Sequence, residues 1–183
     1  MTTPGLTSIR DRAEAWRVHV DDSVAALEVV RGLAGPIVDV GSGGGAPGIP
    51  LAAALPDREV TLLEANGRKC AFLREAARAF PNVNVVQGRA EEQETDRFGI
   101  AVAKALASPP VAAEWCLPLV AVGGAAVLFV GPRADVAAVA RVSKQLGGGE
   151  PDDVGGLLVL RKLEPTPSGF PRRPGIARKR PLA

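Results

Sequence analysis

Residues 37–48 read Ile-Val-Asp-Val-Gly-Ser-Gly-Gly-Gly-Ala-Pro-Gly. An apolar run typical of a buried strand carries one acid, Asp39, and ends in five glycines within eight residues. Glycines allow a tight turn and let a ligand approach the backbone closely. Pro47 suits the first turn of a helix over the apolar residues that follow, and such a helix start offers free N–H groups to an anionic ligand. The stretch therefore predicts a strand–loop–helix unit that binds a nucleotide-type cofactor.

Two cofactor classes fit this loop. Residues 43–48 read as G-x-G-x-x-G, the dinucleotide fingerprint, with an acid, Glu64, about 20 residues further on. Residues 39–45 also read as D-x-G-x-G-x-G, which resembles motif I of S-adenosylmethionine-dependent methyltransferases. An acid two residues before the first glycine favours the second interpretation, because a dinucleotide-binding strand has an apolar residue there. In the methyltransferase pattern, Asp39 orients the loop and lies near the methionine amino group, and Gly41 and Gly43 approach the cofactor.

Composition indicates one soluble domain. The chain has 183 residues, of which 46% are hydrophobic, enough for a single sizeable core. No signal peptide is recognisable, and the longest apolar run, residues 119–130, is too short to span a membrane. The two cysteines, Cys70 and Cys116, lie in apolar helical patterns and match no metal-ligand spacing. We therefore expect reduced core thiols, no metal, no membrane association and a cytoplasmic protein.

Hydrophobic periodicity predicts alternating helices and strands. This alternation is typical of an α/β fold with a doubly wound, mostly parallel sheet, preceded by an N-terminal helical segment. The expected helices cover residues 7–32, 47–55, 67–80, 111–120 and 134–146, and the expected strands cover 37–40, 59–63, 83–87, 100–103, 125–130 and 157–160.

The charge is distributed unevenly along the chain. Residues 161–183 hold seven Lys/Arg against one acid, a net charge of +6, whereas residues 1–160 carry −4. A basic segment on an acidic domain suggests a polyanionic partner, although a merely solvated tail is the alternative. Its many prolines predict an extended, partly mobile strap without helix. The candidate phosphate-binding residues are Arg172, Arg173, Arg178, Lys179 and Arg180.

Four features are expected at one edge of the sheet, because ligands of open α/β sheets bind at the carboxyl ends of the strands. The first is the glycine loop. Glu64 ends the second strand and can accept hydrogen bonds from both ribose hydroxyls. Ala90 and Glu91 follow the third strand and would offer backbone groups to adenine. Lys104 ends the fourth strand and is either a solvated charge or a partner of the methionine carboxylate.

With these residues placed, the chain resembles the bacterial 16S ribosomal RNA guanine-N7 methyltransferases, the glucose-inhibited division protein B family. The resemblance covers nearly all of residues 16–183 and is carried by residues 38–52, 61–74, 88–92, 103–107 and 170–182. It implies that Gly41 and Ala46 contact the cofactor, that Ala90 and Glu91 hold adenine, and that Lys104 stands where the family has Arg. His19, Asp22 and Ser23 resemble the family's H-x-x-D-S element beside the active cleft.

Three departures from the family pattern concern basic side chains. Lys104 keeps the charge of Arg but lacks its planar fork. Val130 occupies a position that is usually Lys, and Gly155 and Gly156 stand where an Arg-His pair is common. We expect these departures to affect RNA docking and efficiency more than cofactor binding.

The chemistry implied by the resemblance needs no general base. Guanine N7 has a free lone pair in the major groove, so its methylation requires positioning rather than proton removal. The chain has no Tyr, and neither cysteine lies in a loop suited to attack on a pyrimidine. His19, the single histidine, is a candidate for a catalytic or merely structural role.

The sequence thus predicts an S-adenosylmethionine-dependent methyltransferase acting on guanine N7 of 16S ribosomal RNA, as naked RNA or within the small ribosomal subunit. We expect a monomer with one domain: an N-terminal helical segment (1–34), a cofactor-binding core (35–164) and the basic strap (165–183). The alternatives are an NAD(P)-dependent oxidoreductase, which lacks a recognisable proton donor, and a non-catalytic RNA-binding protein with a relict cofactor loop.

Overall fold

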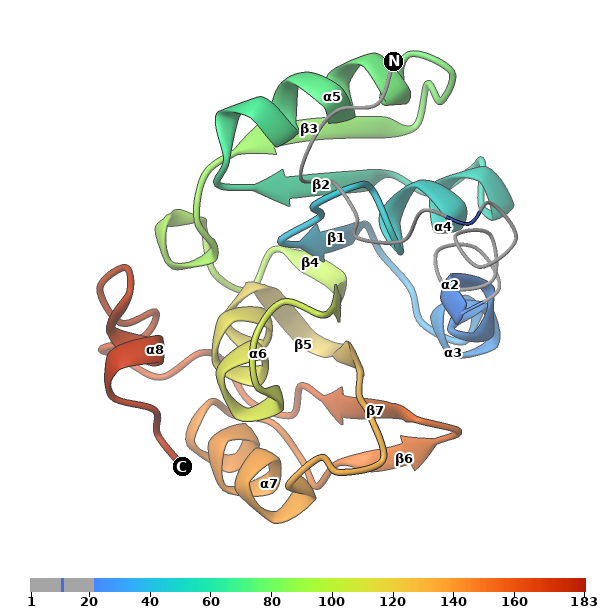
Figure 1. Cartoon of the computed structure of the whole chain (residues 1–183). Coiled ribbons are helices and arrows are strands. Elements are labelled where there is room, and N and C mark those ends of the chain that lie inside the picture. The colour runs from blue at the N-terminus through green and yellow to red at the C-terminus, as the bar shows by residue number, and fades with distance from the viewer. Residues whose placement is uncertain (1–10, 12–21) are drawn as a thin grey trace.

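A seven-stranded sheet organises the chain in the computed structural model, which describes residue 11 and residues 22–183 (Figure 1). The strand order is β3-β2-β1-β4-β5-β7-β6. The first five strands of this order are parallel, whereas β7 is antiparallel to β5 and β6 is antiparallel to β7. The strands are β1 (Ile37–Val40), β2 (Val60–Glu64), β3 (Val83–Gln87), β4 (Phe98–Lys104), β5 (Val120–Phe129), β6 (Asp152–Val154) and β7 (Leu157–Arg161).

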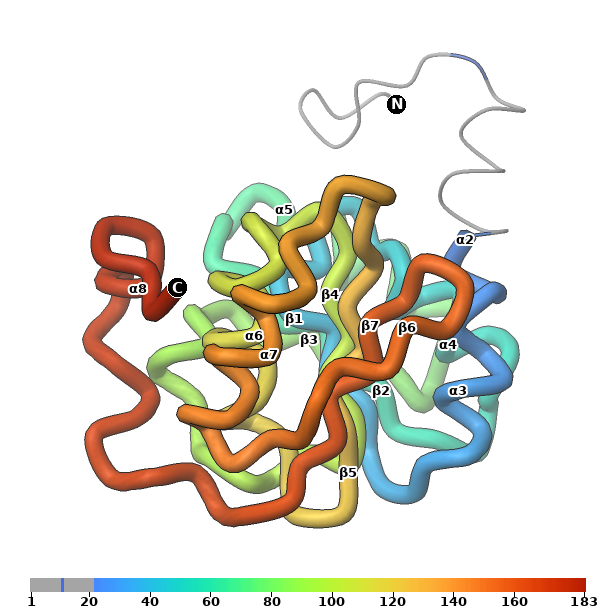
Figure 2. The backbone as a smooth tube through the Cα atoms, turned by 90° about the horizontal axis from the view of Figure 1, so that it is seen from below, coloured from blue at the N-terminus to red at the C-terminus, as the bar shows by residue number. Residues whose placement is uncertain are grey.

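Helices cover both faces of the sheet (Figure 2). On one face lie α2 (Asp22–Ala25), α3 (Leu27–Arg31), α4 (Gly48–Ala54) and α5 (Gly67–Ala77). On the other lie α6 (Pro109–Cys116) and α7 (Val136–Gln145), with the short α8 (Ile176–Lys179) beside α6. Two 3-10 turns, η2 (Ala90–Glu92) and η3 (Leu117–Leu119), complete the described elements.

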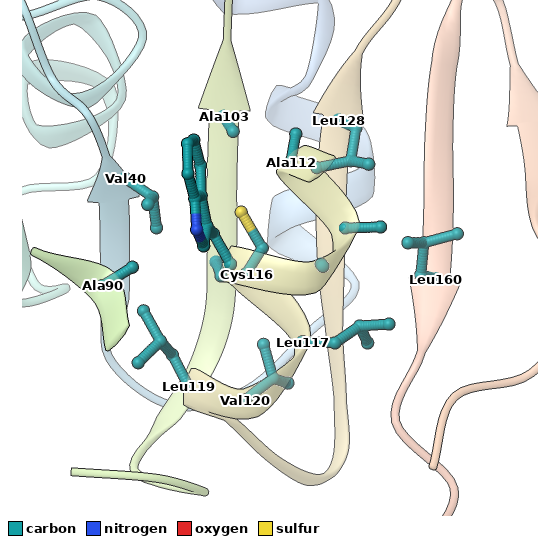
Figure 3. Packing of buried hydrophobic residues seen from close by; sticks show 14 of the residues in the cluster. Val40, Ala90, Ala103, Ala112, Cys116, Leu117, Leu119, Val120, Leu128 and Leu160 are labelled. Carbon is teal, nitrogen blue, oxygen red and sulfur yellow. The ribbon is translucent and has the colours of Figure 1, made fainter. Parts of the chain in front are cut away.

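The two-residue alternation of the strands divides the core into two clusters. In β1, Ile37 faces the cluster under α2–α4, and Val38 and Val40 face the cluster under α6 and α7. The second cluster includes Cys116 and Leu117, which pack near Leu128 and Leu160 (Figure 3). The same alternation sends Asp39 toward α4.

The predicted fold class is confirmed, and most expected elements lie within a few residues of their observed bounds. The order also departs from the classic dinucleotide-binding order 3-2-1-4-5-6, because β7 is inserted antiparallel between β5 and β6. None of the described helices is long and apolar enough to cross a membrane.

Three expectations about the elements were wrong. The helix expected over 111–120 ends at Cys116, and β5 begins at Val120, because Pro118 interrupts the helical hydrogen bonds. The edge strand β6 was missed because its residues are exposed and carry no apolar alternation.

The helical segment expected over 7–32 is not among these errors, because most of it lies outside the described residues.

The third error concerns the C-terminal segment, residues 165–183, which was expected to contain no helix. Residues 176–179 form α8, because they lie between Pro174 and Pro181 and include no proline themselves. Ala177 is buried in the core cluster of α6 and α7. Arg172 donates from Nε and Nη2 to the two carboxylate oxygens of Glu114, at 2.6 Å each. The segment is therefore anchored to α6 by a bidentate ion pair.

Because Arg172 anchors the segment, its removal should destabilise the fold more than removal of the neighbouring Arg173. Glu114 is only 4% exposed, so Arg172→Ala would leave a buried carboxylate without its partner. We expect it to lower the free energy of unfolding by about 2–3 kcal/mol, somewhat below the cost of breaking a fully buried pair because Arg172 is partly exposed. The matched control, Arg173→Ala, removes an exposed guanidinium and should change it by less than about 0.5 kcal/mol. Urea unfolding of both variants measures this, and equal effects would contradict it.

Candidate functional site

The glycine loop connects β1 to α4 over a buried acid. Asp39 is 1% exposed, and its Oδ2 accepts a hydrogen bond of 3.0 Å from the N–H of Gly48 at the start of α4. A side chain at Gly48 would overlap both Asp39 and Leu62, so only glycine fits there. Ser42 donates to the Asp39 carbonyl at 2.8 Å. Asp39 thus fixes where the helix begins beneath the loop.

Burial raises the pKa of Asp39 to about 7, against an ordinary value of 3.8. The hydrogen bonds from Gly48 and Ser42 oppose this effect, and the nearby charge of Glu64 adds to it slightly. No cation forms an ion pair with Asp39 among the described residues. The carboxyl is therefore only partly ionised at neutral pH, and a cationic ligand group near it would favour its charged form.

Glu64 joins the glycine loop to the neighbouring strand. Its Oε2 accepts from the N–H of Gly43 at 2.9 Å, and its Oε1 accepts from the N–H of Asn66 at 2.8 Å. Asn66 caps α5, accepting from the backbone N–H groups of Arg68 and Lys69. Glu64 is 7% exposed. One carboxylate therefore positions both the loop after β1 and the turn after β2.

A cavity of about 290 Å³ opens where these strands end, and we call it the strand-end cavity. It brings together Gly41, Glu64, Ala90 and Glu91, four residues that the sequence placed at this edge. A side chain at Gly41, whose φ is +72°, would overlap Leu106 in the cavity wall. The lining residues are Val40, Gly41, Leu63, Glu64, Ala65, Lys69, Gly88, Arg89, Ala90, Glu91, Ala105, Leu106, Trp115 and Arg178.

Lys104 lies in a neighbouring cavity of about 550 Å³, the Lys104 cavity. Its Nζ is 3.2 Å from Oδ2 of Asp22 in α2, and it lies 5.5 Å from the centre of the Phe129 ring. Alternation along β4 explains this position, because Lys104 points to the opposite face from Ala103. Ala105 lines both cavities, so they adjoin at the end of β4.

The strand-end cavity has the chemistry of an adenosyl site. The carboxylate of Glu64 is a strong acceptor for vicinal hydroxyls, and Ala65, Leu106 and Ala90 supply apolar surface for a planar base. The left-handed glycines Gly41 and Gly43 leave the loop without side chains that would block a ligand. The residues present therefore fit S-adenosylmethionine.

Comparison with known proteins shows which family this chain belongs to. The family described as rRNA small subunit methyltransferase G matches residues 2–145. The chain is 38% identical to the Ribosomal RNA small subunit methyltransferase G of Moorella thermoacetica, over 97% of this chain and 82% of that protein. It is 40% identical to the protein of the same name from Rubrobacter xylanophilus, over 90% of this chain and 72% of that one. The chain belongs to the rRNA small subunit methyltransferase G family.

A solved structure supports the fold. The 1,6-didemethyltoxoflavin-N1-methyltransferase of Burkholderia thailandensis, solved with S-adenosylhomocysteine, matches with a TM-score of 0.60 at 15% identity. The match covers 84% of this chain and 82% of that one. At this identity the likeness establishes a shared methyltransferase fold and nothing about substrate.

The remaining residues that the sequence analysis named as site candidates or as departures from the family pattern lie in several places. Asp39 lies beneath the glycine loop rather than among the lining residues, and Ala46 is partly exposed in the loop before α4. Val130, Gly155 and Gly156, which depart from the family pattern, all line the Lys104 cavity. His19 lies outside the described residues.

Cys70 and Cys116 are buried free thiols, and burial raises the pKa of each.

The basic residues of the C-terminal segment divide into two groups. Arg172 is bound to Glu114, and Arg178 lines the strand-end cavity. The side chains of Arg173, Lys179 and Arg180 are exposed and form no ion pair with another described residue. These three are the residues of the predicted set best placed to meet a phosphate backbone.

Sequence reasoning missed three residues of this region. Trp115 was not singled out, because in the sequence it is one apolar residue of an expected helix, yet it lines the strand-end cavity. Leu106 was quoted only as part of a turn. The pairing of Asp22 with Lys104 was not predicted, because 82 positions separate the two residues. The only signal for Asp22 was its place in the family's H-x-x-D-S element.

The raised pKa of Asp39 predicts a pH-dependent penalty on folding. Below pH 4 the carboxyl is protonated in both states; from about pH 4 to pH 7 it ionises in the unfolded chain while the folded chain retains the proton. Stability therefore falls across this window, by up to about 4 kcal/mol for this group. Asp39→Asn, which is neutral throughout, should gain stability relative to the parent as pH rises.

Urea unfolding at pH 4.5 and pH 7.5 measures this gain, with the exposed Asp57→Asn as control. The Asp39→Asn advantage should grow between the two pH values, whereas Asp57→Asn should track the parent. An Asp39→Asn difference that does not vary with pH would show that the carboxyl is ionised in the folded protein throughout.

Proposed function

We propose that this chain is an S-adenosylmethionine-dependent methyltransferase that methylates N7 of a guanine in 16S ribosomal RNA. The observation that supports the proposal is the strand-end cavity, where Glu64 and the glycine loop meet in a member of the rRNA small subunit methyltransferase G family. The proposed enzyme acts in the cytoplasm as a monomer, on naked RNA or on the small ribosomal subunit.

The cofactor would lie along the ends of the strands. Glu64 accepts hydrogen bonds from the ribose hydroxyls with lone pairs not used by Gly43 and Asn66. Backbone groups of Ala90 and Glu91 hold the adenine edge. Gly41, Gly43 and Ala46 would hold the methionine part of the cofactor, and Asp39 beneath the loop would favour its ammonium group electrostatically.

Lys104 would bind the methionine carboxylate in place of Asp22. The Lys104 cavity adjoins the strand-end cavity at Ala105, so a carboxylate that enters between them competes with Asp22 for the ammonium group. Lysine gives a single point contact here, without the bidentate geometry of arginine.

The reaction requires positioning above all. The cofactor supplies an electrophilic methyl group on a sulfonium, and guanine N7 supplies a free lone pair. No side chain needs to remove a proton before attack, so the protein contributes orientation and a water-poor cleft. The Lys104 cavity, with Phe129 and Val130 in its wall, is the proposed site for the guanine ring.

RNA would be held mainly through its backbone. The exposed Arg173, Lys179 and Arg180 can neutralise phosphates without reading sequence. Arg172, in contrast, is committed to Glu114 and contributes by holding the segment in place.

The test of the function is transfer of a labelled methyl group from S-adenosylmethionine to 16S ribosomal RNA transcribed in vitro and to small ribosomal subunits that lack the modification. Nuclease digestion and chromatography should place the label in 7-methylguanosine, and 23S ribosomal RNA should remain unlabelled. Label in another nucleoside would refute the N7 assignment, and no label in either substrate would refute the activity.

The role of Glu64 gives a separate prediction. Glu64→Gln keeps the shape of the side chain but removes its charge and replaces one acceptor oxygen by an NH2 donor, so affinity for S-adenosylhomocysteine should fall about tenfold or more. The control is Glu59→Gln, an exposed acid just before the other end of β2. Calorimetric titration measures both, and circular dichroism checks that the variants are folded. Affinities that match for the two variants would remove Glu64 from the ribose site.

A further inference from the structure

The C-terminal segment reaches the strand-end cavity from outside the sheet. The N–H of Gly175 donates to Oε1 of Glu91 at 3.0 Å, and Nη2 of Arg178 donates to the carbonyl of Leu106 at 3.2 Å. The guanidinium of Arg178 also lies 5.2 Å from the centre of the Trp115 ring. Glu91, Leu106, Trp115 and Arg178 all line this cavity. Residues more than 60 positions apart in the chain thus form one wall.

The segment is held firmly enough for this wall to have a defined position. Arg172 forms the bidentate pair with buried Glu114, the residue next to Trp115 in α6, and its Nη2 also donates to the carbonyl of Arg180 at 2.9 Å. Ala177 of α8 is buried in the same core cluster as Trp115. The ends of α8 are therefore fixed to the same helix that carries the Trp115 ring.

The same short segment presents its other cations to solvent. Lys179 and Arg180 follow Arg178 directly, and Arg173 precedes the Gly175 contact by two residues. All three side chains are exposed. A phosphate backbone bound by these residues would meet an element whose neighbouring residue lines the cofactor cavity.

We propose that the C-terminal segment is a wall shared by the cofactor and RNA sites, in which Arg178 contacts the bound cofactor and couples the two binding events positively. The proposal rests on the proposed function and adds to it a cofactor contact from outside the sheet and a regulation of affinity. The RNA is recognised here by its phosphates, and the cofactor by its adenosyl part.

The side chain of Arg178 suits this role. A guanidinium has five N–H donors, and among the described residues the Leu106 carbonyl is the one acceptor observed for them. Its planar group can stay over the Trp115 ring while other donors face a ligand in the cavity. Lys179 and Arg180 follow Arg178 directly, so phosphates bound there would favour the position of α8 that brings the Arg178 guanidinium to the cavity, and a cofactor bound in the cavity would favour the same position. By linkage, the two ligands must then raise each other's affinity by the same factor.

The experiment measures affinity for S-adenosylhomocysteine by calorimetry, alone and with saturating 16S ribosomal RNA. This probe cannot react and lacks the sulfonium charge, which would complicate the effect of removing a cation. The chains are the parent, Arg178→Ala, Arg178→Lys and, as matched control, Arg141→Ala, which removes an exposed arginine from α7. Thermal unfolding checks that all four are folded.

In the parent, RNA should raise the affinity about fivefold or more, the lower range of typical coupling between sites. Arg178→Ala should bind the probe alone about fivefold to tenfold more weakly, because it loses charge-assisted donors, and should lose most of the coupling. Arg178→Lys should lie between it and the parent, and Arg141→Ala should match the parent.

Two results would overturn the proposal: an Arg178→Ala variant with parental affinity, or a parent whose affinity is unchanged by RNA. Both leave the proposed function standing as long as the parent binds S-adenosylhomocysteine. A parent that binds neither the probe nor RNA would instead refute the proposed function.

Discussion

The carboxylate of Glu64 is the interaction on which the site depends. It lies at the end of β2 and accepts backbone hydrogen bonds from Gly43 on one side and Asn66 on the other. A loop so rich in glycine has few side chains to hold its own shape, and its conformational entropy is large. Charge-assisted hydrogen bonds to a nearly buried acceptor provide that restraint from the neighbouring strand. The cavity floor and the start of α5 are thereby set by one residue.

A second buried acid, Asp39, positions the same loop, but burial of its charged form opposes folding. Asp39 accepts from the first N–H of α4, yet its burial, with no ion pair from the described part of the chain, raises its pKa to about 7. An ionised carboxylate in this place opposes folding, and a cationic ligand group would reverse that effect. The loop is thus held by two acceptors with different consequences: Glu64 stabilises its shape in the absence of ligand, and Asp39 favours the arrival of positive charge. A carboxylate beneath the loop suits the methionine ammonium group of S-adenosylmethionine better than the anionic pyrophosphate of a dinucleotide.

Much of this arrangement could be predicted from the sequence because its signals are local. The glycine loop, the acid at each strand end and the alternation of β1 and β2 lie within short stretches, and the alternation of strands and helices indicates a mostly parallel, doubly wound sheet. The antiparallel pairing of β7 with β5 and the edge strand β6 were not predicted. Contacts across the chain could not be predicted in this way. Arg172 and Glu114 are 58 residues apart, and nothing in either stretch indicates the pairing. The four residues of α8 are too few to show periodicity, and prolines around them suggested an extended chain.

The C-terminal segment changes how the two sites relate. A detached basic strap would add RNA affinity and leave the cofactor untouched, whereas a segment bonded to Glu91 and Leu106 belongs to the cavity itself. The exposed cations then lie on an element whose position depends on Glu114 and Trp115. Small-subunit RNA and cofactor would accordingly meet on a single surface at the end of the sheet.

The central claim is that the strand-end cavity holds an adenosyl cofactor of the methionine class. Calorimetric titration of the full chain with S-adenosylhomocysteine and with NAD, side by side at neutral pH, tests it most directly. The account predicts a saturable isotherm with one S-adenosylhomocysteine per chain and no measurable heat of binding for NAD. Saturable NAD binding, with no S-adenosylhomocysteine binding, would contradict it and restore the dinucleotide interpretation of the glycine loop.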